Sequence, residues 1–362
     1  MLKQLCFVAF AAVAATHIEP VAAGYLDENP DEVFSDVYQR LGIGLPPNVA
    51  RDPYVWILLG ELKREPCDQK SIENLALLLD KMGYRREAAE GQYGFVKKCG
   101  QPVSALHRSV DIFLKLTDYA KAVEVADEFI RRAPTNHNAH YLRGVALAGA
   151  GDFRRAIVDY TNAIELFDSD RRKMSSRVFL AMAKAHAELG QFCDAAGAIL
   201  MWVAIDPARN NTDQSQKIIA DYEHKGNCGS AKQLQKERYV LSGQKNVVTV
   251  KAEINGVRGT FILDSGASHT TVRSAFADRA KIPWTDASEV VLRTANGLAK
   301  GRLTNAQKVM LGKLEATHVP VIVQKIDGYG ANVDGLLGMS FLSRFDVQLA
   351  GGYIEIRTRR PN

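Results

Sequence analysis

Two patterns of hydrophobic and polar residues divide this chain. From about residue 70 to about residue 225, apolar and small residues recur with a period of about 34 residues, which is typical of paired helices. Beyond about residue 247, apolar and polar residues alternate instead, as in the run VVTVKAEINGVRGTFILD that ends at Asp264. Such alternation is typical of strands. The sequence therefore predicts a helical domain followed by an all-β domain.

The clearest copy of the helical repeat runs from Ala139 to Leu166. Its small residues, Gly144, Ala156 and Ala163, would let two helices of a hairpin approach closely, and Tyr160 would fill the gap to the next hairpin. A turn signature recurs at Gly83-Tyr84, Asp118-Tyr119, Asp152-Phe153 and Gln191-Phe192. This region resembles an array of roughly three or four tetratricopeptide repeats (TPR). The resemblance implies a concave face that binds peptides or partner proteins; a spacer or dimerisation element is the alternative.

The alternating part of the chain contains further strand and turn signals. Asn255-Gly256 is a hairpin turn signal within the first alternating run. Other strand-like runs occupy residues 290–292, 308–311, 318–323 and 353–356. A closed all-β domain of roughly a hundred residues would account for them.

The run FILDSGASHTT, which begins at Phe261, carries the candidate chemistry. Three apolar residues lead a strand into Asp264, and Ser265 and Gly266 then turn the backbone. A carboxylate in this position is poorly solvated but close to backbone N–H groups, a setting in which it can activate water. Two carboxylates that share one proton are needed for aspartic-protease chemistry, because like charges about 3 Å apart cannot both ionise. The sequence has one such run, so two chains would have to meet.

At this point the C-terminal third resembles the retropepsin-like aspartic proteases, which are dimer-forming relatives of pepsin with half its length. The resemblance covers roughly residues 245–357 and rests on two elements. The first is 262–268, which fits two apolar residues followed by Asp-(Thr/Ser)-Gly-(Ala/Ser), with Ser265 where Thr is commoner. The second is Leu336, Leu337 and Gly338, followed by the helix-like run MSFLSRF.

The resemblance implies a complete catalytic arrangement. The two elements would pair in a psi-shaped loop around a catalytic Asp264, supported by Ser265 and Gly266. A β-hairpin flap, with Asn296 and Gly297 at its turn, would close over a peptide or protein substrate. Two chains would form a homodimer through this domain, with their terminal strands in one interface sheet, and neither a cofactor nor a metal would be needed. His269 has no role in this pattern, and we expect an exposed loop histidine.

Composition narrows the range of partners. With 46% hydrophobic and 24% charged residues, the chain has the make-up of a globular protein. The net charge of +5 is modest, and no Lys/Arg-rich run with interleaved aromatic residues occurs. Nucleic-acid binding is therefore not expected.

The N-terminus has the features of a signal peptide. Lys3 precedes the apolar run Cys6–Ala15, which is short for a membrane span, and small residues suitable for cleavage end at Ala15 and at Ala23. We favour cleavage after Ala23, with no stable membrane insertion afterwards; an uncleaved anchor is the alternative. The mature chain would then be exported, to the periplasm if the source is a Gram-negative bacterium, or secreted.

Removal of this segment would leave four cysteines, Cys67, Cys99, Cys193 and Cys228. An even number of cysteines in an exported chain suggests two disulfides, and three connectivities are open. The simplest pairs Cys67 with Cys99 and Cys193 with Cys228. A zinc site is disfavoured, because no pair has CxxC spacing.

These observations predict a multidomain protein, in which an all-α solenoid of TPR type precedes an all-β retropepsin-like barrel. The predicted divisions are a signal peptide (1–23), an irregular or capping segment (24–66), the repeat domain (67–228), a linker (229–246) and the protease-like domain (247–362). The leading functional hypothesis is an exported aspartic endopeptidase whose repeats recognise a substrate or partner. The alternatives are a TPR adaptor whose protease-like domain dimerises or binds peptides without cleavage, and an enzyme that stays latent until a partner binds.

Overall fold

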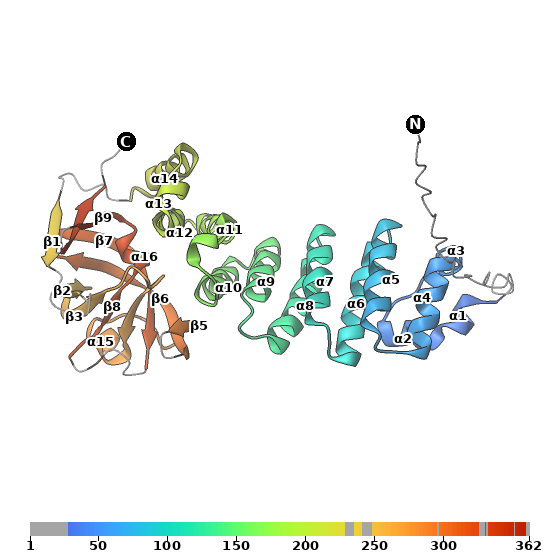
Figure 1. Cartoon of the computed structure of the whole chain (residues 1–362). Coiled ribbons are helices and arrows are strands. Elements are labelled where there is room, and N and C mark those ends of the chain that lie inside the picture. Colours follow the sequence, from blue (N-terminus) through green and yellow to red (C-terminus); the bar gives the residue numbers. More distant parts are fainter. Residues whose placement is uncertain are drawn as a thin grey trace, which may run out of the picture.

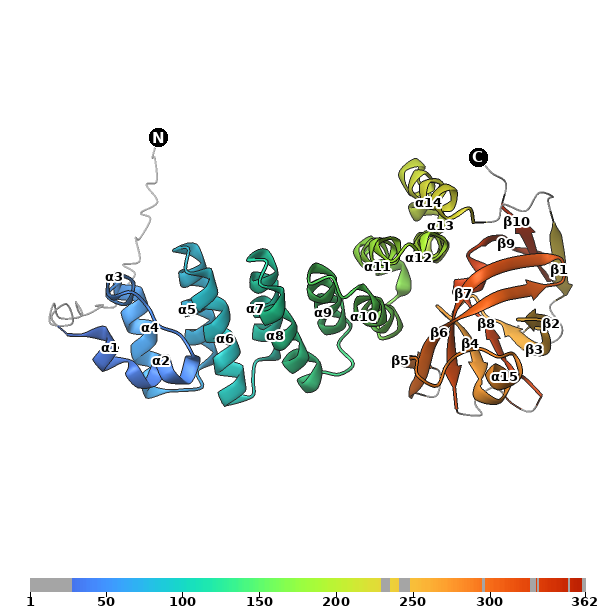
Figure 2. The same ribbon diagram turned by 180° about the vertical axis from the view of Figure 1, so that it is seen from behind.

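The computed structural model describes residues 28–228, 235–240, 248–294, 297–325, 330, 332–350 and 352–359. Figures 1 and 2 show an arm of stacked helices that leads to a β-rich domain at the other end of the molecule. Both predicted domains are therefore present. The predicted signal peptide, residues 1–23, lies outside the described residues.

The arm is built from helical hairpins that stack side by side (Figure 1). The pairs α5–α6, α7–α8, α9–α10 and α11–α12 form its regular part. The helices are α1 (Pro30–Val33), α2 (Ser35–Leu41), α3 (Pro47–Ala50), α4 (Pro53–Arg64), α5 (Gln69–Lys81), α6 (Arg85–Cys99), α7 (Val103–Lys115), α8 (Tyr119–Arg132), α9 (His137–Gly149), α10 (Phe153–Glu165), the 3₁₀ helix η2 (Arg171–Lys173), α11 (Ser176–Glu188), α12 (Phe192–Ile205), α13 (Pro207–Asn210) and α14 (Asp213–Gly226).

The hairpin of α9 and α10 packs as the repeat pattern predicts. A Cβ atom on Gly144 would lie only 2.7 Å from Cε1 of Tyr160, whose side chain is buried. The absence of a side chain at Gly144 therefore allows the close approach of the two helices. Gly151, with φ of 84°, turns the chain between them, and Asp152 caps α10 by accepting a hydrogen bond from the backbone N–H of Arg155.

Most of residues 30–64, within the segment that we expected to be irregular or capping, is helical. Leu41, Val55 and Leu59 from this segment are buried in the same core as α5 to α8. Prolines often interrupt regular structure, but Pro30, Pro47 and Pro53 each begin a helix. Proline fits that position because the missing N–H has no intrahelical partner there. Helices α1 to α4 therefore extend the arm and cover its first hairpin.

The described residues of the β-rich domain form two sheets. Its strands and helices are β1 (Lys236–Val240), β2 (Val248–Ile254), β3 (Val257–Leu263), β4 (Thr270–Arg273), α15 (Ser274–Arg279), β5 (Ser288–Thr294), β6 (Gly297–Leu311), β7 (Leu314–Gln324), β8 (Gly335–Leu337), α16 (Met339–Leu342), β9 (Phe345–Ala350) and β10 (Tyr353–Thr358). The larger sheet has the order β2-β3-β8-β4-β7-β6-β5, and an extra pairing of β2 with β6 curls it around one hydrophobic core.

The smaller sheet changes the predicted linker boundary. Its order is β1-β10-β9, so Lys236–Val240, within the expected linker 229–246, is a strand paired with the C-terminal strand of the same chain. The five residues alternate between exposed and half-buried positions, and their partner lies more than a hundred residues away, beyond the range of local sequence signals. Residues 229–234 and 241–247 lie outside the described residues.

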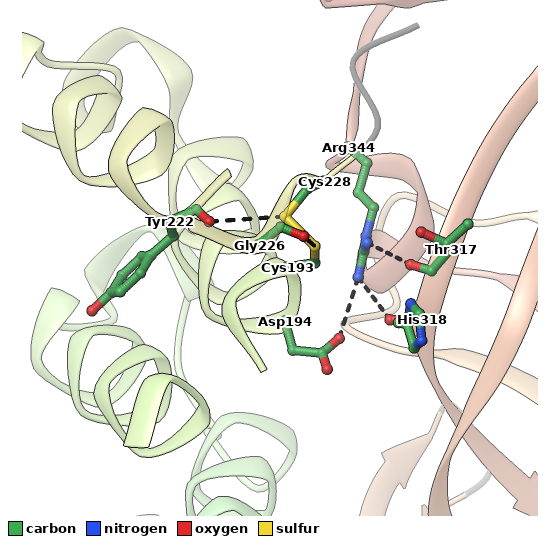
Figure 3. Close-up of a disulfide and its surroundings, with 8 residues drawn as sticks. All are labelled: Cys193, Asp194, Tyr222, Gly226, Cys228, Thr317, His318 and Arg344. Carbon is green, nitrogen blue, oxygen red and sulfur yellow. Dashed lines mark hydrogen bonds and ion pairs between the residues drawn. A yellow bond between two sulfur atoms is a disulfide. The ribbon is translucent and has the colours of Figure 1, made fainter. Parts of the chain in front are cut away.

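The structure has both of the simplest disulfide pairings, Cys67–Cys99 and Cys193–Cys228. The second joins α12 to the end of α14, close to the β-rich domain (Figure 3). Next to Cys193, the Asp194 carboxylate lies 3.6 Å from a guanidinium nitrogen of Arg344, which follows α16. This ion pair connects the two domains.

Candidate active site

Asp264 lies at the end of β3, where the chain leaves the larger sheet. Its backbone N–H donates a 3.1 Å hydrogen bond to the carbonyl of Leu337 at the end of β8, and β3 and β8 run parallel. The backbone N–H of Gly266 donates to Oδ1 of Asp264 at 2.8 Å. The carboxylate is thus oriented by its own turn, in the arrangement of strand and Ser-Gly turn that the sequence predicts.

The second predicted element, Leu336–Gly338, lies directly behind this turn. A Cβ atom on Gly338 would lie 2.4 Å from the carbonyl oxygen of His269 and 2.9 Å from that of Ala267, so the close approach of the two segments requires glycine. Hydrogen bonds continue the contact into α16, because Met339 N–H donates to the carbonyl of Ala267 and Ser340 N–H to that of Ser268.

The tip of the loop faces outward. Asp264 is half-buried, whereas Ser265 and Gly266 are exposed in the single chain. Beside the tip, a cavity of about 120 Å³ is lined by Ser265 and Ser268 together with residues of the helical domain, among them Arg171 and Met174. A second chain could therefore reach the turn from solvent on one side, while the helical domain borders it on another.

A hairpin occupies the predicted position of the flap. Strands β5 and β6 pair antiparallel from Ser288↔Leu303 to Thr294↔Gly297. Gly297 has φ of 106°, a conformation that side chains other than glycine rarely adopt. Asn296, the other predicted turn residue, lies outside the described residues.

The expectation that His269 is an exposed loop residue is wrong. Its side chain is 1% exposed, and its Nδ1 lies 2.6 Å from a carboxylate oxygen of Glu165 in α10. Docking of the helical domain covers this side of the loop. Sequence reasoning missed the pair because a loop histidine is usually solvated, and nothing in the local sequence marks the surface that another domain will cover.

The interface between the domains also encloses a cavity of about 260 Å³. His186 and Asp194 lie in its wall, where burial lowers the pKa of His186 and raises the pKa of the Asp194 carboxyl. The guanidinium group of Arg344 reduces the shift for Asp194 and also donates hydrogen bonds to the carbonyls of Thr317 and His318 (Figure 3). The pair of Asp194 and Arg344 thus offsets only part of the cost of burying charge at this interface, because burial also lowers the pKa of Arg344.

Neither a metal site nor a membrane span is apparent in the described part of the chain. No group of three or more His, Cys, Asp or Glu side chains there is arranged to hold a metal ion. None of the described helices combines the length and the apolar composition that crossing a bilayer requires.

Residues 250–341 match the family model described as aspartyl protease. This range includes Asp264, the β5–β6 hairpin and Gly338. The C-terminal domain is a retropepsin-like domain. The helical domain that precedes the retropepsin-like domain has the stacked hairpins of a TPR array. A search of curated proteins finds no match to the chain.

Several solved structures are similar to one or other half. A retropepsin-like aspartic protease from Rickettsia conorii is 23% identical, over 35% of this chain and 92% of its own, with a TM-score of 0.30. MamA from Desulfovibrio magneticus RS-1 is 17% identical, over 50% of this chain and 98% of its own, with a TM-score of 0.36. A thermophilic TPR protein from Thermus thermophilus is 18% identical, over 54% of this chain and 98% of its own, with a TM-score of 0.33. At these values the similarities say nothing about what this chain binds or cleaves.

Proposed function

We propose that this chain is an exported aspartic endopeptidase that acts as a homodimer. The observation that carries the proposal is the position of Asp264, which ends a core strand in a glycine turn held from behind by Gly338, within the segment that matches the aspartyl protease family. The exposed Ser265 and Gly266 support it further, because a dyad needs a second chain to approach this turn.

In the proposed dimer, the two Asp264 side chains face each other and share one proton. The ionised carboxylate takes a proton from a bound water, and the water oxygen bonds to the carbonyl carbon of the scissile peptide. The protonated carboxyl of the other subunit stabilises the developing oxyanion. When the C–N bond breaks, the departing amine takes up a proton from the dyad, and two peptides with new termini are released.

The other elements have supporting roles in this proposal. The Ser265 hydroxyl braces the two catalytic loops, and the β5–β6 hairpin closes over the bound peptide. The TPR array would bind an extended segment of the substrate or of a partner protein. Export is supported by the two disulfides, which persist in oxidising compartments, and by the apolar run near the N-terminus.

The proposal is tested with the full mature chain and a diverse peptide library, from about pH 4 to about pH 8, with products identified by mass spectrometry. We expect cleavage by the wild type and none by Asp264→Asn. Asp278→Asn is the matched control, because it removes an exposed carboxylate of the same domain and should retain activity. Equal cleavage by wild type and Asp264→Asn would overturn the endopeptidase proposal. Cleavage by neither would leave the non-cleaving adaptor and the latent enzyme, and the same assay on a covalently forced dimer would decide between them: continued silence would overturn the proposal.

A further inference from the structure

Helix α10 contacts both elements that would surround a substrate. Near its C-terminal end, Glu165 pairs with His269 of the loop that carries Asp264. One turn earlier, Oδ1 of Asn162 accepts a 2.9 Å hydrogen bond from the backbone N–H of Val291, in strand β5 of the proposed flap. Asn162 and Glu165 are three residues apart, so they lie on the same face of the helix. One helical face therefore holds the catalytic loop and the flap strand together.

The contact with the catalytic loop involves two successive loop residues. The Glu165 and His269 side chains are 5% and 1% exposed, so their interaction is little weakened by solvent. From η2, Nη1 of Arg171 donates a hydrogen bond to Oγ of Ser268, and Nη2 lies 3.9 Å from Oε2 of Glu165. The helical domain thus binds the loop through a connected network of four side chains.

This network acts on the segment that begins at Asp264. Ser268 and His269 follow Asp264 closely in the sequence, and the carbonyl of Ser268 accepts a hydrogen bond from the Ser340 N–H behind the loop. The Ser340 side chain in turn accepts a hydrogen bond from the N–H of Thr270. The segment is therefore fixed by α16 on one side and by the helical domain on another. Removal of the second support would leave its position less defined.

We propose that Glu165 and Arg171 are positioning residues for Asp264, so that the helical domain completes the active site of the retropepsin-like domain. The inference rests on the proposed endopeptidase function. Neither residue touches the reacting atoms; both act through the loop. Because a misplacement of about 1 Å at a reacting group can lower a rate by roughly a hundred-fold, loss of this support should reduce kcat much more than it changes KM.

The test compares variants on the same helix in the full chain. For Glu165→Ala we expect kcat to fall roughly ten- to a hundred-fold with little change in KM, and Glu165→Gln, which keeps an oxygen that can accept from His269, to retain more activity. Asp159→Ala is the matched control. Asp159 is 1% exposed and pairs with Arg143 inside the arm, so its loss should lower the thermal unfolding midpoint without lowering kcat.

A second measurement does not depend on cleavage. Hydrogen–deuterium exchange of residues 264–270 should be faster in Glu165→Ala than in wild type, and unchanged in Asp159→Ala. Unchanged exchange in Glu165→Ala, or an equal fall in kcat for Asp159→Ala, would overturn the inference. If wild type cleaves no peptide even as a covalently forced dimer, the proposed function fails, and the exchange rates still decide whether Glu165 holds the loop.

Discussion

At the interface between the domains, burial acts in opposite directions on two neighbouring groups. The pKa of His186 is lowered and that of Asp194 is raised, because each charged form loses hydration there. For His186, the loss of hydration outweighs the nearby Asp194 carboxylate and the 2.8 Å contact between Nδ1 and the side-chain oxygen of Gln191, both of which favour the protonated form. His186 therefore resists protonation in the folded protein, whereas in the unfolded chain it takes up a proton near its ordinary pKa of 6.5.

This difference predicts a loss of stability in acid. Because the unfolded state binds more protons at His186, this residue should lower the thermal unfolding midpoint as the pH falls from about 7.5 to about 5.5, whereas the raised pKa of Asp194 acts in the opposite direction. In His186→Gln the decrease should be smaller, since one titrating group is removed. His107→Gln, at an exposed position of α7, serves as the control and should keep the wild-type dependence. Identical pH dependence of wild type and His186→Gln would contradict the prediction.

The residues that carry the proposed chemistry could be predicted from sequence, whereas those that support them could not. Asp264 and Gly338 lie in short motifs that can be recognised from neighbouring residues alone. Each follows a strand, and at each the backbone of another segment approaches closely. Glu165 and His269 lie about a hundred positions apart and meet only because two domains dock. The polar residues Asn162 and Glu165 lie three positions apart on α10, and this spacing was the one available signal of a covered polar face.

Among the secondary-structure elements, the hairpins of the arm depend on contacts between small and aromatic residues. Gly144 and Tyr160 hold α9 and α10 at a distance that leaves no room for a methyl group. This hairpin was predictable because the same pattern of small and aromatic residues recurs along the chain. The helices α1 to α4 were not predictable, because they fall outside the repeat and because a proline can either begin a helix or interrupt one.

The packing predicts the effect of enlarging the glycine. Gly144→Ala should destabilise the arm by about 1–3 kcal/mol, because the new methyl group overlaps the Tyr160 ring. Adding Tyr160→Leu, which removes that ring edge, should make the double variant more stable than the sum of the single effects predicts. Chemical denaturation followed by circular dichroism measures this. Gly60→Ala in α4, where nothing lies within 4 Å of the new atom, should cause no loss; a loss as large as that of Gly144→Ala would refute the explanation.

For the whole molecule, the proposed dyad of two chains would make activity depend on association. Mixing equal amounts of wild type and Asp264→Asn should leave only about a quarter of random dimers with two intact aspartates. Activity per wild-type chain should therefore fall by about half, given free exchange of subunits, and should fall further on dilution. The measurement is initial cleavage rate, with an unrelated protein added as control. A rate strictly proportional to wild-type concentration and indifferent to the variant would point to a site complete in one chain.

The position of the retropepsin-like domain at one end of the arm also affects which parts of the gene can vary during evolution. Figures 1 and 2 show α1 to α8 lying away from this domain, which packs against α10 and α12. Each hairpin touches mainly its neighbours, so duplication, loss or recombination of the codons for the first hairpins would leave the retropepsin-like domain unaltered. Selection would then act separately on the first hairpins of the arm and on the retropepsin-like domain. Homologous genes should keep the codons for Glu165, Arg171 and His269 together while their first hairpins diverge in number and sequence, so that one retropepsin-like domain would be combined with different binding surfaces.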